Sequence, residues 1–322
     1  MSSRARSVAV ALADAMLADA WTQAEMIVQG AEILGDTPRW LEQLVQTVRR
    51  AYPRAPRDRP RELARFIHGL EVFRDNVDRR PVRIRRRPVR PTSTVATRWA
   101  TPSLDDLAQL ARWLGLSDDH LDWFADRRGL NRHASDERLR HYRYRWRPAR
   151  LIEAPKHRLR TLQRWVLDDL LGPVPVHPDV HGFVPGRGPH TFAAVHAGRR
   201  TVIRVDLTSF FASIGAPRVY GLLRTAGHPE PVAHALAALC TTRTPAGVLR
   251  TAPSTMADRA YRLALLRTPH LPQGAPTSPA LANLAAFSLD RRLSGLARAL
   301  GASYSRYADD LTLSGPRRLA ST

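Results

Sequence analysis

Apolar residues recur at helical spacing through the first part of the chain, from residue 7 to about residue 78. Leu41, Leu44 and Val48 fall on one face of a helix, and Leu63 and Ile67 fall together on another. This spacing predicts a helical N-terminal extension over residues 1–78.

The opening segment, MSSRARSVAVALADAMLADAW, places arginines before an apolar run, as a signal peptide would. Asp14 and Asp19 interrupt that run, and its period is helical, so we expect an amphipathic helix. Elsewhere no stretch approaches the roughly 20 uninterrupted apolar residues that span a bilayer. The sequence therefore predicts no membrane-spanning segment.

The pattern breaks at residues 79–99, RRPVRIRRRPVRPTSTVATRW, where repeated prolines disfavour helix and a dense arginine run disfavours a packed core. We interpret this stretch as a basic linker. Arg83, Arg85, Arg86 and Arg87 either form a solvated tether or contact nucleic acid, and the overall charge favours the second interpretation.

Helical spacing returns over residues 100–135, and it is followed by strict alternation in YRYRWR, residues 142–147. Tyr142, Tyr144 and Trp146 would point to one face of a β-ribbon, and the intervening arginines to the other. A long amphipathic helix is predicted to start near His157.

Three further patterns place polar groups next to apolar runs. Val202, Ile203 and Val205 predict a strand that ends in Asp206. LPQGAPTSPALANL begins as an irregular loop, with Gln273 at its head, and becomes a helix. YSRYADDLTLSG predicts two strands joined by a tight turn, with Asp309 and Asp310 at the tip. Taken singly, Asp206 could be a helix N-cap, and the acidic pair an ordinary turn.

Composition adds a strong positive charge, because 50 lysines and arginines against 29 acidic residues give +21. Such an excess favours a polyanionic partner, foremost nucleic acid. The single cysteine, Cys240, excludes a disulfide within one chain and fits a reducing cytoplasm.

Carboxylates at a strand end and at a hairpin turn, with a Gln-Gly loop between them in the sequence, suit two-metal phosphoryl transfer. Two Mg²⁺ ions about 4 Å apart need shared carboxylate oxygens. Cations would also offset the repulsion between Asp309 and Asp310.

At this point the chain resembles reverse transcriptases, most closely the bacterial retron type. The resemblance rests on five stretches that occur in the family's order: RLIEAPKHRLRTLQRW, VHPDVHGFVPGRG, RVDLTSFFASI, LPQGAPTSPALANL and YSRYADDLTLSG. It implies an α+β right-hand polymerase fold, with residues 100–135 leading into the fingers and residues 136–322 forming fingers and palm.

The resemblance also implies roles for individual residues. Asp206, Asp309 and Asp310 would be the catalytic, metal-binding aspartates, and the carbonyl of Leu207 a further ligand. Phe211 would exclude a ribose 2′-hydroxyl and so favour dNTPs. The remaining nucleotide-pocket residues implied by the resemblance are Gln273, Arg150 and Lys156.

In two respects the chain departs from the family pattern. Phe192 of FAAVH stands where retron enzymes usually have asparagine, and the chain stops a few residues after the YADD hairpin, before the end of the palm and the thumb. A truncated product, a fragment, or a split enzyme with a separately encoded C-terminal part would each account for this ending.

The expected partners are a retron noncoding RNA that serves as template and primer, its cDNA, dNTPs and a defence effector, with a role in antiphage defence. Two alternatives stay open. One is a catalytically impaired RNA-binding fragment that lacks the thumb, and the other is a group II intron-like or other bacterial reverse transcriptase.

Overall fold

The computed structural model describes residues 3–18, 20–56, 59–77, 84, 99–126, 129–132, 134–148, 150–317 and 319. These residues fall into two compact units, one built on the helices within residues 3–77 and the other on residues 107–227 and 232–319. The predicted basic run of Arg83, Arg85, Arg86 and Arg87 lies outside the described residues.

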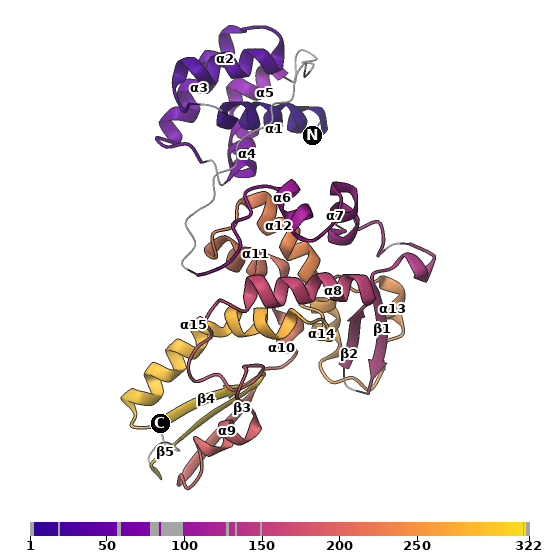
Figure 1. Ribbon diagram of the computed structural model, residues 1–322, viewed down its shortest axis with the longest axis vertical. Helices are drawn as coiled ribbons and strands as arrows, with labels where there is room; N and C mark the ends of the chain where they lie inside the picture. Colours follow the sequence, from indigo (N-terminus) through magenta and orange to yellow (C-terminus); the bar gives the residue numbers. More distant parts are fainter. Residues whose placement is uncertain are drawn as a thin grey trace. The chain divides into compact units, whose positions relative to one another are not determined.

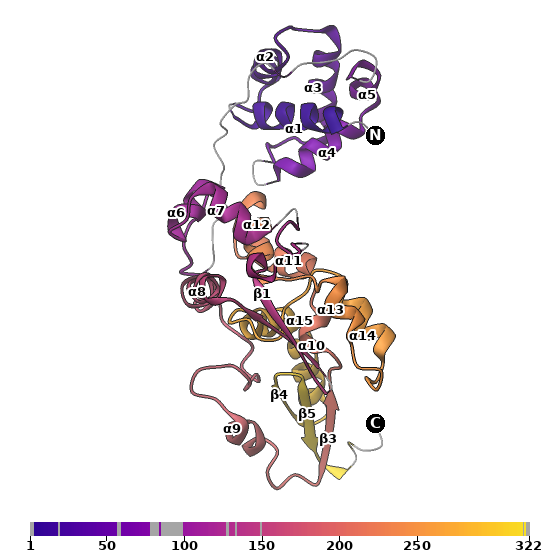
Figure 2. The ribbon, with the colours of Figure 1, turned by 90° about the vertical axis from the view of Figure 1, so that its right-hand side faces the viewer.

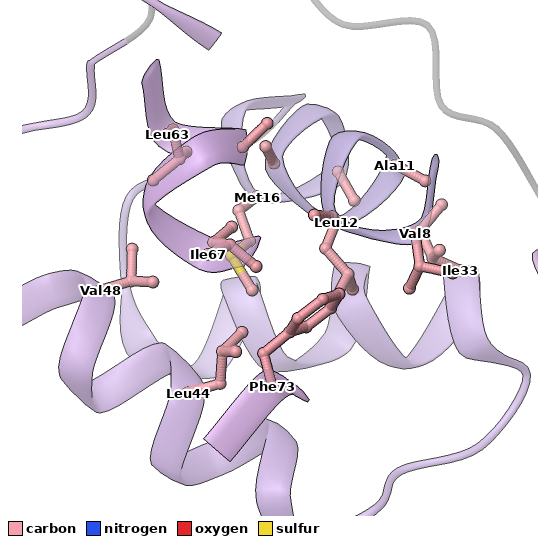
Figure 3. Close-up of a cluster of buried hydrophobic side chains, with 14 of the residues drawn as sticks. Val8, Ala11, Leu12, Met16, Ile33, Leu44, Val48, Leu63, Ile67 and Phe73 are labelled. Atoms are coloured by element: carbon pink, nitrogen blue, oxygen red, sulfur yellow. The ribbon is translucent and has the colours of Figure 1, made fainter. Parts of the chain in front are cut away.

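The first unit is a helical bundle around one apolar core. Its described helices are α1 (Ser3–Ala18), α2 (Gln23–Leu34), α3 (Arg39–Ala51), α4 (Pro60–Gly69) and α5 (Glu71–Val77). Leu12, Met16, Leu44, Ile67 and Phe73 come from four of these helices and point into a shared interior (Figure 3), where each is at most 1% exposed. The apolar spacing of α3 and α4 therefore faces this core, as the sequence predicted.

The second unit combines helices with two small antiparallel sheets, which confirms the expected α+β class. Its described helices are α6 (Leu107–Trp113), α7 (Asp118–Ala125), η1 (Glu137–Leu139), α8 (His157–Trp165), η2 (Val166–Leu171), α9 (Pro189–Ala194), α10 (Phe210–Ser213), α11 (Ala216–Thr225), α12 (Glu230–Cys240), α13 (Ala246–Arg250), α14 (Arg259–Leu266) and α15 (Ser278–Ala299). Within the described segments, no helix is both long and apolar enough to cross a bilayer.

The first sheet is the hairpin of β1 (Tyr142–Arg147) and β2 (Arg150–Pro155). Burial alternates along β1 as predicted, because Arg143, Arg145 and Arg147 are exposed while the aromatic residues between them are buried or half-buried. Trp146 is fixed from its polar side, since its indole Nε1 donates to the carbonyl of Val248 over 3.1 Å. The hairpin therefore carries a row of arginines on its open face.

The second sheet contains β3 (Thr201–Asp206), β4 (Ser303–Tyr307) and β5 (Asp310–Gly315), in the order β3-β5-β4. Figure 2 shows the three strands side by side. Helices α15 and α9 both pack on β4 (Figure 1). Val202 and Val205 of the edge strand β3 remain about half exposed.

The turn between β4 and β5 differs from the expectation. We predicted Asp309 and Asp310 together at the tip, but the turn consists of Ala308 and Asp309, and Asp310 is the first residue of β5, paired with Tyr307. The tight turn is possible because Ala308 adopts a positive φ of 57°, at a cost on the order of 1 kcal/mol for a residue with a Cβ.

Candidate active site

A pocket of about 380 Å³ in the second unit collects residues from segments that lie far apart in the sequence. Asp206 comes from the end of β3 and Asp309 from the β4–β5 turn. Phe211 comes from α10, Gln273 from the loop before α15, and Arg150 from the start of β2. The pocket thus brings together five of the residues that the sequence nominated.

Asp206 and Asp309 are joined through the backbone. The amide of Leu207 donates to the carbonyl of Asp309 over 3.0 Å, which holds the strand end against the turn. Both aspartates are exposed, and neither carboxylate makes a hydrogen bond or an ion pair with a described residue. Their oxygens are therefore available to a cation.

This donor set fits Mg²⁺, which binds through one or two carboxylates and completes its shell with water and substrate phosphates. No group of three or more His, Cys, Asp or Glu side chains that could hold a metal occurs in the described part of the chain. A cation at Asp206 and Asp309 would therefore need further oxygens from backbone, water or substrate.

Asp310 lies directly opposite Asp206 in the β3–β5 register but does not line the pocket. Its carboxylate is bound by Arg204, whose Nε donates to Oδ1 (3.0 Å) and whose Nη2 donates to Oδ2 (2.6 Å). The ion pair with Arg204 therefore neutralises the charge of Asp310, one of the two adjacent carboxylates of the YADD motif, without a metal.

Lys156 is placed away from the pocket. Its Nζ donates to the carbonyls of Glu137 (2.6 Å) and Arg138 (3.0 Å), and so ties the end of the β1–β2 hairpin to η1. By contrast, Arg150 is exposed at the pocket, and its guanidinium makes no hydrogen bond or ion pair with a described residue.

Glu153 is a pocket residue that sequence reasoning missed. It is 1% exposed, its amide donates to the carbonyl of Gln273 (2.8 Å), and its carboxylate accepts from the Thr244 hydroxyl (2.7 Å). The other carboxylate oxygen lies 2.8 Å from His270 Nε2, and His270 Nδ1 lies 2.7 Å from the Thr268 carbonyl. Burial disfavours the charged imidazole, but the Glu153 carboxylate and the Thr268 carbonyl together favour it and raise the pKa of His270.

A second group that the sequence analysis missed supports the turn between β4 and β5. Arg306 precedes the YADD motif and is fully buried, where its guanidinium binds Asp290 of α15 and donates to the carbonyl of Ala308 (2.8 Å) and to Asn283 Oδ1 (3.1 Å). Asn283 and Asp290 share a face of α15 because they stand seven residues apart. That spacing, together with an arginine within the strand Ser303–Tyr307, was the signal that the sequence offered.

The FAAVH segment is anchored to the three-stranded sheet. His196 lies 2.7 Å from the hydroxyls of both Ser305 and Ser314, and burial lowers its pKa. Phe192, at the position where retron enzymes usually have asparagine, packs beside Tyr307, with ring centroids 5.9 Å apart. The segment therefore fixes the strands on either side of the acidic turn.

Comparison with known proteins places the chain in a family. A family model described as reverse transcriptase (RNA-dependent DNA polymerase) matches residues 145–319, more than half of the chain. Retron Mx65 reverse transcriptase of Myxococcus xanthus is 39% identical over 274 residues, which is 80% of this chain and 60% of that protein. Retron Mx162 reverse transcriptase, from the same organism, is 41% identical over 218 residues, 66% of this chain and 42% of that protein.

A third relative is the Retron Ec86 reverse transcriptase of Escherichia coli, 34% identical over 165 residues, 51% of this chain and 44% of that protein. The chain thus spans about half the length of the curated relatives that it matches. The family match contains every pocket residue discussed above, including Asp206 and Asp309. On these findings the chain belongs to the reverse transcriptase family, and its similarity is to members of the retron type.

Proposed function

We propose that the chain catalyses RNA-directed DNA synthesis of the retron type, in which a primer 3′-hydroxyl attacks the α-phosphate of a dNTP and pyrophosphate leaves. The observation that carries the proposal is the convergence of Asp206 and Asp309 in one pocket with Phe211, Gln273 and Arg150. Neither carboxylate is held in a hydrogen bond or ion pair by a described residue. In this assignment the β1–β2 hairpin belongs to the fingers and the three-stranded sheet to the palm.

Asp206, Asp309 and the carbonyl of Leu207 are the groups that would hold two Mg²⁺ ions. Bound there, the ions would supply Lewis-acid polarisation of phosphate oxygens and neutralise the charge that develops during transfer. Asp310 is proposed as a further ligand on the family resemblance, although its carboxylate would first have to leave Arg204.

The other pocket residues would select and orient the nucleotide. The half-buried ring of Phe211 lines the same pocket as Asp206 and Asp309, and it would occupy the space of a 2′-hydroxyl. Gln273 would contact the nucleotide from a loop whose backbone is tied to Glu153, and Arg150 would bind the triphosphate. Lys156 would act indirectly, by holding the hairpin that carries Arg150.

The partner we propose is a noncoding RNA that supplies both template and primer. The net charge of +21 and the exposed arginines of β1 support a nucleic-acid backbone as ligand. A cytoplasmic location and a role in antiphage defence, with an effector or a separately encoded C-terminal part as partner, rest on the family resemblance alone.

The deciding experiment is primer extension on an RNA template with Mg²⁺ and labelled dNTPs, comparing the parent with Asp309→Asn. Asp119→Asn is a matched control, since it makes the same charge change at an exposed position of α7. We expect synthesis by the parent and by the control, none by Asp309→Asn, and equal RNA binding by all three.

An alternative is RNA binding without synthesis, which the strong positive charge also favours. In that case all three proteins would bind RNA and none would extend the primer. Extension that is equal in the parent and in Asp309→Asn would instead refute the catalytic site.

A further inference from the structure

Phe183 combines two uncommon features in one residue of the VHGFVPGRG stretch. Its backbone adopts a positive φ of 60°, a region that a bulky residue rarely occupies. Its side chain is 50% exposed, although it lines the pocket that contains Asp206 and Asp309. A strained backbone that presents an apolar ring to solvent at an active site calls for a ligand-based explanation.

The loop that carries Phe183 is fixed directly to the catalytic turn. Gly182 approaches so closely that a Cβ there would collide with the amide nitrogen of Ala308. The carbonyl of Gly182 accepts from Asn283 Nδ2 (3.0 Å), and the amide of His181 donates to the carbonyl of Arg306 (2.8 Å). Phe183 therefore follows a segment whose position is set by the same residues that support Asp309.

Phe183 is also the exposed end of a row of aromatic rings. Its ring centroid lies 6.2 Å from that of Phe211, which lies 5.8 Å from that of Phe210. Phe210 is buried, with the guanidinium of Arg306 5.6 Å from its centroid. The row thus extends from Phe210, which lies next to Arg306, through Phe211, the proposed sugar gate, to Phe183 at the open pocket.

We propose that Phe183 is a nucleobase platform, on which a base of the nascent base pair packs while the phosphates lie near the Mg²⁺ ions that Asp206 and Asp309 would hold. A flat apolar ring suits this task because every base offers a π-face, so contact does not depend on sequence. The inference rests on the proposed polymerase function. The base can belong to the incoming dNTP or to the template strand, and the two sources are separated by experiment.

The test compares Phe183→Leu, which removes the aromatic face, with Phe183→Trp, which keeps it, and Phe183→Gly, which removes the ring and relieves the positive φ. For each protein we would measure single-nucleotide extension on an RNA template, binding of the same primer–template in Ca²⁺ with and without the next complementary dNTP, and thermal unfolding. The binding assay requires no turnover.

We expect Phe183→Leu and Phe183→Gly to weaken binding about tenfold, and Phe183→Trp to stay within about twofold of the parent. Phe183→Gly should at the same time unfold at an equal or higher temperature than the parent. A loss seen only with dNTP present, together with a raised KM for dNTP, assigns the incoming base. A loss already present without dNTP assigns the template base.

Primer–template binding by Phe183→Leu that equals the parent's would overturn the platform. So would weaker binding in all three variants that parallels a lowered unfolding temperature, because the loss would then reflect stability. A ring that merely supports Phe211 would give a third pattern, in which Phe183→Leu incorporates ribonucleotides without weaker binding, and this too would overturn it. If the parent binds primer–template but does not extend it, the proposed function fails while the binding series still decides the platform. If the parent binds no primer–template, both proposals fail.

Discussion

Arg306 and Asp290 form a fully buried ion pair directly beneath the turn that carries Asp309. The guanidinium donates to both carboxylate oxygens, at 2.7 and 2.8 Å, and each side chain is 0% exposed. Tyr304 adds a third hydrogen bond to Asp290 (2.8 Å). Because Arg306 also donates to the carbonyl of Ala308, the pair holds the positive-φ residue of the turn in place.

Removal of one partner of this pair should be costly. In Asp290→Asn the buried guanidinium loses its counter-charge, and we expect unfolding in urea to require about 3–5 kcal/mol less than in the parent. A loss below about 1 kcal/mol would mean that the pair is solvated in solution.

The double variant Asp290→Leu with Arg306→Met separates stability from positioning. An apolar pair of similar volume should recover most of the stability lost in the single variant. Primer extension should stay impaired, because the carbonyl of Ala308 has lost its donor. Recovery of both properties would show that Arg306 does not position the turn.

Sequence pattern predicted those parts of the molecule that depend on neighbours along the chain. Apolar spacing located the helices of the first unit, alternation located β1, and motif order located Asp206 and Asp309 in one site. The buried Arg306–Asp290 pair was not predicted, because a charged residue on a helix is expected at the surface unless the packing of α15 on β4 is known. Asp310 was misplaced for a related reason: a two-residue turn requires Ala308 to adopt a conformation that its side chain disfavours.

Phe211→Ala tests the proposed sugar gate. Without the ring, the pocket gains room beside Asp206, and we expect incorporation of ribonucleotides to rise at least tenfold relative to dNTPs, a change of about 1.4 kcal/mol in discrimination. The measurement is the ratio of kcat/KM values for matched rNTP and dNTP. Phe287→Ala, a partly exposed aromatic of α15 outside the pocket, is the control and should keep the parent's ratio.

The arginine run before the second unit can be tested through salt dependence. Replacement of Arg83, Arg85, Arg86 and Arg87 by glutamine should reduce the slope of log affinity for single-stranded RNA against log salt by up to about 3, if all four contact phosphates. The measurement is RNA binding by fluorescence anisotropy over a salt series. A slope equal to the parent's would assign the run to a tether.

The buried Glu153–His270 pair makes a prediction about pH. The folded chain raises the pKa of His270 above its ordinary value of 6.5 despite burial, because Glu153 favours the charged imidazole. The folded state therefore binds this proton more tightly than the unfolded state does. Its contribution to stability is complete below about pH 6.5 and is lost as pH rises through the folded pKa.

We therefore expect the free energy of unfolding to fall between pH 6 and pH 8.5 by more in the parent than in His270→Gln, as measured by urea denaturation. His120→Gln removes an exposed histidine of α7 and should follow the parent. Since the amide of Glu153 donates to the carbonyl of Gln273, the same rise in pH should also loosen the proposed nucleotide pocket and raise the KM for dNTP in the parent. A pH dependence of stability identical in the parent and in His270→Gln would mean that the pair carries no net proton linkage.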